Sequence, residues 1–444
     1  RLDPDPLSPP LWRTCVIMLA LAMVVYAPAA VGAELLQFDD NFFFGPDNPE
    51  FVRGLGAVWT DPIANAYLPV AHTSLWIDYW LTGGAPLLPH LHAVLLHAAA
   101  AVVLARLLLV MGLQTATAHV AAAIFVVHPA LAESVAWVSS RKYVLSGMFV
   151  FGALLQTARY AAKPSPSRAV AVALLTMLAM LSNATAVVTP LLAIGVVLWA
   201  GGARRRFVAP LLSVLVAVLL AFMHQQVAAA QGTLAGADAS ARLAQVPGAF
   251  AHYVATAVWP FGLNVLYPEV ATLEAFREQW LRGAILLCVA LGVVVACSWR
   301  PRTRAVGAGL CAFLLALLPF NTAYPASSIA AADRYLYLAI PGLALAVTAA
   351  ATLLHRRGIW VAGALVAPLL WGAAARAGDF RDDAQLWQAS LRVDESNAVA
   401  HLNLVYDRLR APDTPIDRLV PHLQDAVKAA RYPVHELRAR ILLR

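Results

Sequence analysis

Charged residues are what this sequence has least of. Only 13% of its 444 residues are Asp, Glu, Lys or Arg, where an ordinary soluble domain has about 25%. Hydrophobic residues make up 61% of the chain, and the mean hydropathy is +0.69. A soluble chain cannot hide so much apolar surface, and a disordered chain does not contain it. The composition therefore excludes both classes and predicts an integral membrane protein.

Cysteines and the common nucleotide and hydrolase motifs are also scarce. All four cysteines lie in apolar runs without a C-x-x-C pair, which indicates helix packing rather than disulfides or a metal centre. The chain has no Walker A sequence, no G-x-G-x-x-G opening a helix, no H-E-x-x-H and no G-x-S-x-G. Nucleotide-driven transport and lipase chemistry therefore lack support. No cofactor is firmly implied, and no metal is demanded.

Eleven runs are apolar and long enough to be membrane helices, since about 20 residues cross a bilayer core. They are 11–33, 88–111, 117–132, 143–160, 167–182, 185–201, 207–226, 281–299, 305–320, 335–354 and 358–375. The segment 247–268 is broken by prolines and is predicted to be interfacial or re-entrant. The predicted fold class is an all-α, polytopic integral membrane protein with about 11 transmembrane helices, the first of them uncleaved.

Basic residues gather in four alternate gaps between these runs, and those gaps contain no acid. They are Arg159, Lys163, Arg168, Arg204, Arg205, Arg206, Arg300, Arg302, Arg304, Arg356 and Arg357. The positive-inside rule then places the N-terminus in the cytoplasm and the C-terminus outside. This predicts a multi-pass inner (cytoplasmic) membrane protein whose site faces the periplasm or exterior. The net charge of +7 reflects these loops, so membrane lipids and no nucleic acid are the expected partners.

A pair of carboxylates, Asp39 and Asp40, follows the first apolar run. Like charges next to lipid raise a carboxyl pKa, which suits a general base. The alternative is a solvated pair that caps a helix. An aromatic-rich stretch at 59–81 comes next and predicts interfacial helices within an outer loop at 34–87.

Two further polar clusters fall on the predicted outer side. The second cluster comprises His128, Glu133, Arg141 and Lys142, and the third comprises Asp333, Arg334, Tyr335 and Tyr337. Arg and Lys side chains at headgroup level can clamp a phosphate. We expect Asp333 to orient Arg334 through a salt bridge. The alternative for each cluster is a structural ion pair at a helix end.

These motifs, in this order, resemble the GT-C membrane glycosyltransferases. Within them the chain resembles the bacterial relatives of the TMTC-type (transmembrane and tetratricopeptide-repeat) O-mannosyltransferases. The resemblance covers nearly the whole chain and is carried by short stretches. These are Asp39-Asp40, Asn65 to Ser74, PHLHAVLLH (89–97), HPALAESVAW with Arg141-Lys142, ADRYLYL (332–338), DDAQLW (382–387) and NAVAHLNLVY (397–406).

The resemblance implies transfer of a hexose such as mannose, with inversion, from a polyprenyl-phosphate donor to an acceptor hydroxyl on a protein Ser/Thr or a glycan. It implies Asp40 as the general base, with Asp39 as the second choice. The donor phosphate would be bound by Arg141, Lys142, Arg334 and His128. The supporting residues would be Glu133, Asp333 and Tyr335.

Two alternatives stay open. The first is a transporter or flippase for a lipid-linked sugar, although the spans show no polar path through the bilayer. The second is an inactive scaffold member. It is motivated by Asn183, which stands where the family often has a lysine.

The chain divides into a transmembrane catalytic domain at 1–375 and an extracytoplasmic helical tail at 376–444. In the tail, amphipathic patterns predict helices over 381–392, 397–410 and 417–430, with a last helix opened by Pro433. The first two resemble the start of a tetratricopeptide repeat. Fewer than three repeats cannot bury a continuous core, so the tail is predicted to be a short cap packed on the outer loops.

Overall fold

The structure, a computed structural model, describes residues 10–45, 49–63, 66–231, 239–267, 273–321, 331–354, 357–410 and 419–429. Across these ranges the regular elements are helices, and the one β feature is an isolated bridge between Ile63 and Ala66. The all-α prediction is therefore confirmed for the described part of the chain.

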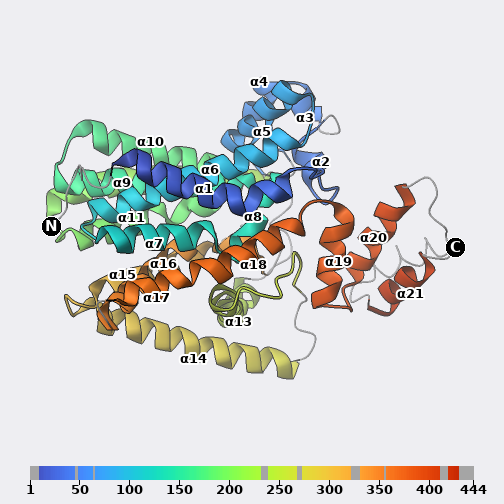
Figure 1. Ribbon diagram of the computed structural model, residues 1–444. Coiled ribbons are helices and arrows are strands. Elements are labelled where there is room, and N and C mark those ends of the chain that lie inside the picture. Colours follow the sequence, from blue (N-terminus) through green and yellow to red (C-terminus); the bar gives the residue numbers. More distant parts are fainter. Residues whose placement is uncertain are drawn as a thin grey trace.

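Long apolar helices lie side by side in a bundle (Figure 1). They are α1 (Leu11–Ala30), α6 (Leu87–Val110), α7 (Thr115–Val126), α9 (Arg141–Ala162), α10 (Pro166–Ser182), α11 (Thr189–Trp199), α12 (Val208–Ala230), α14 (Leu273–Ser298), α15 (Arg304–Asn321), α16 (Ile340–Leu354), α17 (Gly358–Ala364) and α18 (Val366–Gly378). Their sequences are rich in Ala and Leu, which are strong helix formers. Each predicted apolar run overlaps one of these helices, and α17 and α18 share the last run.

Fewer helices pass a test of length and hydropathy than the eleven predicted spans. Among the described residues, five helices are long and apolar enough to cross a membrane. A sixth span results if α7 and the segment Pro129–Ala136, bent by 54° relative to it, are counted together. Four more apolar helices are shorter. One of them begins with the 3-10 turn η3 (Ala184–Val188), which takes up the first residues of the run 185–201. The count of eleven stays a prediction.

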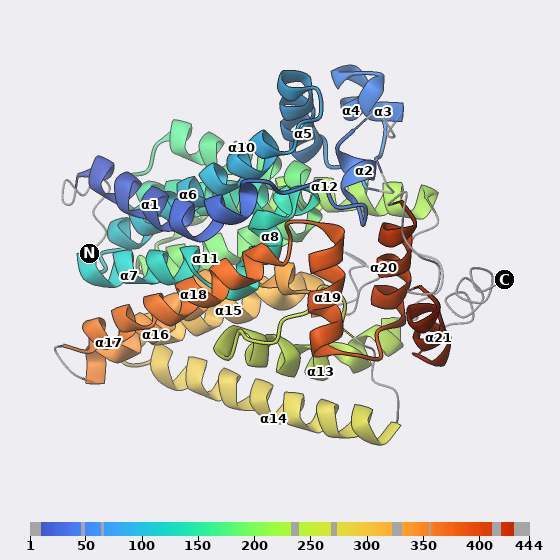
Figure 2. The same cartoon turned by 45° about the vertical axis from the view of Figure 1, so that its right-hand side comes forward.

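The two ends of the bundle differ in charge. At one end the Tyr160 hydroxyl donates to the carbonyl of Arg205 (3.3 Å), and Arg304 donates to the carbonyl of Trp199 (2.6 Å). Basic loops therefore lie together there. The short helix that carries the acidic pair, α2 (Asp40–Phe43), lies at the opposite end (Figures 1 and 2). This separation is the one that the charge pattern predicts.

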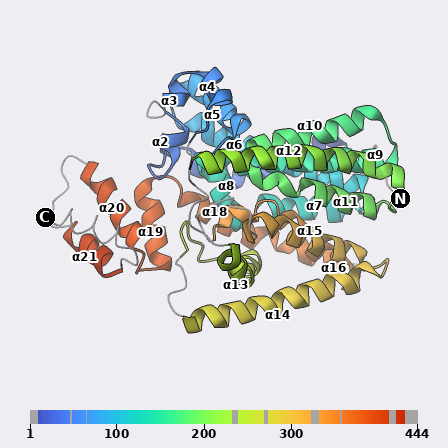
Figure 3. The ribbon, with the colours of Figure 1, turned by 180° about the vertical axis from the view of Figure 1, so that it is seen from behind.

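Short helices surround the acidic end of the bundle. They are α3 (Pro49–Val52), α4 (Leu55–Thr60), α5 (Pro69–Thr82), η1 (Pro129–Leu131), α8 (Ala132–Ala136), η2 (Val138–Ser140) and η5 (Asp333–Leu336). Helix α13 (Ala239–Val258), which includes the first part of the segment 247–268 predicted to be interfacial or re-entrant, is seen nearly end-on while α12 and α14 run across the picture (Figures 1 and 3). It therefore lies across the bundle direction.

The tail contains α19 (Asp383–Val393), α20 (Ala398–Arg410) and α21 (Val420–Ala429). These helices begin and end within three residues of the predicted ones. The helix predicted to open at Pro433 lies outside the described residues. Figure 2 shows α19 below α2, at the same end of the bundle.

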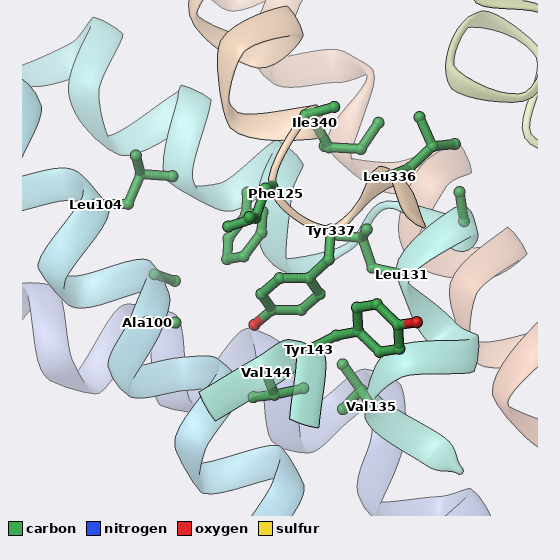
Figure 4. Close-up of a cluster of buried hydrophobic side chains, with 14 of the residues drawn as sticks. Ala100, Leu104, Phe125, Leu131, Val135, Tyr143, Val144, Leu336, Tyr337 and Ile340 are labelled. Atoms are coloured by element: carbon green, nitrogen blue, oxygen red, sulfur yellow. The ribbon is translucent and has the colours of Figure 1, made fainter. Parts of the chain in front are cut away.

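An aromatic contact in the core fixes the position of η5. Figure 4 shows Tyr337 among buried side chains that include Phe125. The Tyr337 ring meets the Phe125 ring edge-on with centroids 5.3 Å apart, and the Tyr337 hydroxyl lies 2.8 Å from Nδ1 of His97. Gly147 is essential to this packing, because a Cβ at that position would lie 2.4 Å from the Tyr337 ring. Because Tyr337 is anchored in this way, the backbone at Arg334, three residues before it in the chain, is held in place.

Candidate functional site

Asp40 is fully buried at the start of α2. One carboxylate oxygen accepts a hydrogen bond from the Leu36 amide (2.9 Å), and the other accepts from the Ser139 amide (2.9 Å) and the Ser139 hydroxyl. Burial raises the pKa of Asp40 to about 6, although these hydrogen bonds oppose the rise. Both oxygens of this carboxylate are thus engaged in joining α2 to η2.

Asp39 stands at the N-cap of α2, but its side chain caps no backbone amide. It is half-buried. Burial raises its pKa, and the nearby Lys142 and Arg334 oppose the rise. Of the two carboxylates, Asp39 is the one that keeps its oxygens open to a substrate and that faces cations.

Lys142 lies in the first turn of α9, with its Nζ 4.9 Å from the centroid of the Phe43 ring. Burial and Arg334 lower its pKa to about 8, and Asp39 opposes this shift. The same Phe43 ring stacks on His72 (5.5 Å), a buried imidazole whose pKa burial and Lys142 lower to about 3. Within the described ranges, Lys142 has no ion-pair partner within 4.0 Å.

Arg141 has different surroundings from its neighbour, because consecutive residues on a helix point about 100° apart. It is fully buried and forms an ion pair with Asp78. It also donates to the Ser74 hydroxyl (3.1 Å) and to the Pro89 carbonyl (2.6 Å). The arginine thus ties α5 to α6 and α9, and its charge is already neutralised.

Glu133 holds Arg334 in place. This contact is the one expected of Glu133 as a supporting residue. The Glu133 carboxylate accepts from both the guanidinium and the backbone amide of Arg334 (3.1 Å for the amide). The guanidinium also lies over the rings of Trp137 (5.5 Å) and Tyr335 (5.2 Å). Tyr335 in turn stacks on Phe320 with centroids 4.1 Å apart.

The expected salt bridge between Asp333 and Arg334 is not formed, so that prediction is wrong. Asp333 instead accepts a hydrogen bond from the Tyr267 hydroxyl (2.6 Å) and lies 3.7 Å from Arg376. Burial and Glu133 raise its pKa. Asp333 and Arg334 have different partners because the Arg334 guanidinium is already ion-paired with Glu133.

His128 is buried, and both of its ring nitrogens have backbone partners. Nε2 lies 3.1 Å from the Ala257 carbonyl oxygen, and Nδ1 accepts from the Ala130 amide (3.3 Å). The imidazole therefore holds the bend between α7 and η1 against α13. This arrangement leaves it no free nitrogen for a phosphate.

The tail is fastened directly to the acidic segment. The Gln37 amide donates to the Asp383 carboxylate (3.0 Å), and the Glu34 amide donates to the Arg381 carbonyl (2.7 Å). The Trp387 ring meets the edge of Phe38, the residue before Asp39, with centroids 5.2 Å apart. Helix α19 thus forms part of the support of the acidic pair.

The sequence patterns did not identify several residues that shape the site. They are Ser139, Asp78, Tyr267 and Arg376. Each is far along the chain from its partner: Ser139 and Asp40 are 99 residues apart. No local pattern marks such pairs, because their partners are set by helix packing.

Asp39 thus lies within electrostatic range of Lys142 and Arg334, since Phe38 before it stacks on Trp137 (5.3 Å), the ring that Arg334 covers, and Phe43 of the same helix lies under Lys142. Asp40, Arg141 and His128 are engaged in internal bonds. The group around Asp39 pairs a carboxylate, able to accept a proton, with Lys142, a cation that forms no ion pair with a described residue. Arg334 contributes a second positive charge nearby, although its guanidinium is already ion-paired with Glu133. Among the described residues there is no group of three or more His, Cys, Asp or Glu side chains that could hold a metal ion.

No protein-family model matches the chain, and no curated protein matches it. Among solved structures, it is similar to the apo oligosaccharyltransferase of Archaeoglobus fulgidus, with 12% sequence identity and a TM-score of 0.41. The match covers 96% of this chain and 60% of that one. The chain therefore spans less than two thirds of that protein's length, and a likeness at this level assigns no activity.

Proposed function

We propose that this protein is a membrane glycosyltransferase of the GT-C type. It moves a hexose from a polyprenyl-phosphate donor to an acceptor hydroxyl, on a protein Ser/Thr or a glycan, outside the cytoplasm. The observation that carries the proposal is the grouping of Asp39 with Lys142 and Arg334 at the end of the bundle away from the basic loops. There a lipid-anchored donor and a water-borne acceptor can meet.

In the proposed reaction, Asp39 takes the proton of the acceptor hydroxyl. The acceptor oxygen attacks the anomeric carbon, and the bond from that carbon to the phosphate oxygen breaks. The electron pair leaves with the polyprenyl phosphate, and the proton passes from Asp39 to water. A single displacement of this kind inverts the anomeric carbon.

Asp39 is preferred to Asp40 as the base because of their hydrogen bonds. Asp40 uses both oxygens to hold Leu36 and Ser139, whereas Asp39 caps no amide. A base needs a lone pair directed at the substrate. Asp40 is then a positioning residue that fixes the backbone of Asp39.

Lys142 and Arg334 are proposed to hold the leaving phosphate. Both cations lower the pKa of Asp39, and Lys142 forms no ion pair with a described residue, so Lys142 is the main phosphate ligand and Arg334, paired with Glu133, adds to the positive field. Fixed cations that meet a developing negative charge lower the barrier. Glu133 and Tyr335 keep Arg334 in place.

The test is transfer by the purified protein in liposomes that contain radiolabelled polyprenyl-phosphate hexose and candidate acceptors. Asp39→Asn should lower kcat by about 100-fold or more, the usual contribution of a general base. Glu34→Gln is the matched control, because Glu34 is an exposed carboxylate on the same segment. Transfer by Asp39→Asn at the wild-type rate would exclude Asp39 as the base.

The same liposomes separate the two alternatives. A flippase would move the lipid-linked sugar between leaflets without joining it to any acceptor. A scaffold would do neither. Asn183, which motivates the scaffold alternative, accepts from the Thr185 amide (3.1 Å) and hydroxyl (3.0 Å) and so caps η3.

A further inference from the structure

Trp137 lies at the junction between the acidic segment and Arg334. It connects α8 to η2, and only 2% of it is exposed. The Phe38 ring stacks on it at an interplanar angle of 27° with centroids 5.3 Å apart, and Phe38 directly precedes Asp39. The Arg334 guanidinium lies 5.5 Å from the centroid of the same indole. Trp137 therefore contacts both the segment of the proposed base and one of the proposed cations.

The indole N–H of Trp137 has no acceptor. Nε1 is buried, and no described residue forms a hydrogen bond with it. A buried donor in this state costs free energy relative to a paired one, and such donors are rare in folded proteins. An indole N–H can only donate, so it cannot be satisfied by turning into an acceptor as a hydroxyl can. Its state indicates an acceptor that comes with a ligand.

Trp199, at the basic end of the bundle, shows the same arrangement with the hydrogen bond made. The Arg304 guanidinium lies 4.5 Å from the centroid of its ring, and its Nε1 donates to the Met111 carbonyl (2.9 Å). An arginine over the indole therefore does not prevent the N–H from being paired. What Trp137 lacks is the acceptor.

The neighbours of Trp137 indicate which ligand atom it binds. Lys142 supplies the positive charge that a phosphate needs, and Asp39 supplies the carboxylate that takes a proton. A neutral N–H adds no charge and suits an uncharged oxygen. Phe38 and Arg334 already lie against the ring, so the N–H is the part of this side chain that is left to bind.

We propose that Trp137 recognises the sugar of the donor, with its Nε1–H donating a hydrogen bond to a hexose hydroxyl. The identity of the donor rests on the proposed function. A site built to hydrogen-bond a substrate hydroxyl rejects an analogue without it, because the buried donor is then left unpaired. Trp137 is thus a specificity residue, and the unpaired N–H of the empty site is the cost of that specificity.

The test is binding of lipids to the full-length protein in detergent, measured by thermophoresis without any acceptor. The probes are polyprenyl-phosphate mannose, polyprenyl-phosphate glucose and bare polyprenyl phosphate. Trp137→Phe should weaken binding of the preferred sugar lipid by about tenfold, the effect of losing one buried hydrogen bond. It should leave the Kd of the bare phosphate unchanged. The matched control is Trp199→Phe, which should change neither Kd.

A second variant keeps the size of the ring. In β-(3-benzothienyl)alanine a sulfur atom replaces the indole N–H, and amber suppression can place it at one position. At position 137 it should weaken sugar binding as Trp137→Phe does and leave the Tm of the empty protein unchanged, since no hydrogen bond is lost. At position 199 it should lower the Tm, since the bond to Met111 is lost.

Three outcomes would overturn the proposal. The first is an equal loss of affinity for sugar-bearing and bare lipid in Trp137→Phe, which would assign the N–H to the phosphate. The second is a wild type that binds both sugar lipids no more tightly than the bare phosphate. The third is a lowered Tm with unchanged binding for the analogue at position 137, which would mean that the N–H holds a buried water.

The binding test is separate from the transfer test. Sugar binding that depends on Trp137, together with no transfer to any acceptor, would remove the proposed transferase and leave the sugar recognition standing. Transfer that proceeds with equal affinity for the sugar lipids in the wild type and Trp137→Phe would do the reverse.

Discussion

Lys142 carries a charge that depends on pH in the range where enzymes work. Its pKa is lowered to about 8 by burial and by Arg334, so the ammonium is present below that pH and is lost above it. If Lys142 holds the donor phosphate, KM for the donor should rise as the pH goes from 7 to 9. Lys142→Arg should keep KM nearly constant, since a guanidinium stays charged.

Initial rates against donor concentration at both pH values check this prediction. The wild type should lose affinity between them, by about tenfold for one lost charged hydrogen bond. An equal rise in KM for the wild type and Lys142→Arg would show that another group titrates.

Ser139 is predicted to act on Asp40 in a pH-dependent way. The pKa of Asp40 is raised to about 6 in the folded protein, so the folded state binds its proton more tightly than the unfolded state does. The resulting stability is full below about pH 4 and is lost as the pH rises through 6. Above that pH the ionised carboxylate depends on the Ser139 hydroxyl.

Ser139→Ala should therefore lower the free energy of unfolding by about 1–3 kcal/mol at pH 7.5 and by less at pH 5. Thermal unfolding at the two pH values, with the exposed Ser167→Ala as the control, measures the difference. A cost that is the same at both pH values would mean that the hydroxyl does not stabilise the charged form.

At this scale the sequence predicts which stretches carry the site but not which member of each pair faces it. Asp39-Asp40 and Arg141-Lys142 are visible as doublets. The choice between neighbours depends on Ser139 and Asp78, which reach their partners only after the helices pack. Asp40, the first choice for the base, and Arg141, predicted together with Lys142 as a phosphate ligand, turn out to be the members with internal partners.

At the scale of elements, α19 is predicted to be a clamp on the acidic segment. Trp387→Ala removes the ring that meets Phe38 and should loosen residues 34–40. Hydrogen exchange of the Gln37 amide, which donates to Asp383, should become faster, and kcat should fall more than KM changes. Trp371→Ala, an exposed tryptophan on α18, is the control.

Unchanged exchange at Gln37 together with unchanged kcat would show that the acidic segment is held without α19.

Helices such as α19 and α20 were predictable because their amphipathic patterns are local. Their docking was not, since it depends on single contacts such as Asp383 with Gln37, which are 346 residues apart.

For the whole molecule, the separation of charge along the bundle is the feature that orients it. Residue contacts gather the basic loops at one end, and α2, α8 and the tail helix α19 lie toward the other (Figure 1). Cytoplasmic loops carry an excess of Lys and Arg. The end that bears Asp39 and the tail should therefore face away from the cytoplasm.

Labelling with a membrane-impermeant maleimide tests this orientation in a variant whose four cysteines are replaced by alanine. Ser396→Cys, on the tail, should react in intact spheroplasts of an expression host. Ser167→Cys, in the first turn of α10 next to the basic loop, should react only after permeabilisation, since both positions are exposed in the fold and only the membrane separates them. Reaction of Ser167→Cys in intact spheroplasts would reverse the orientation, and the candidate site would then face the cytoplasm, where the proposed acceptor is not found.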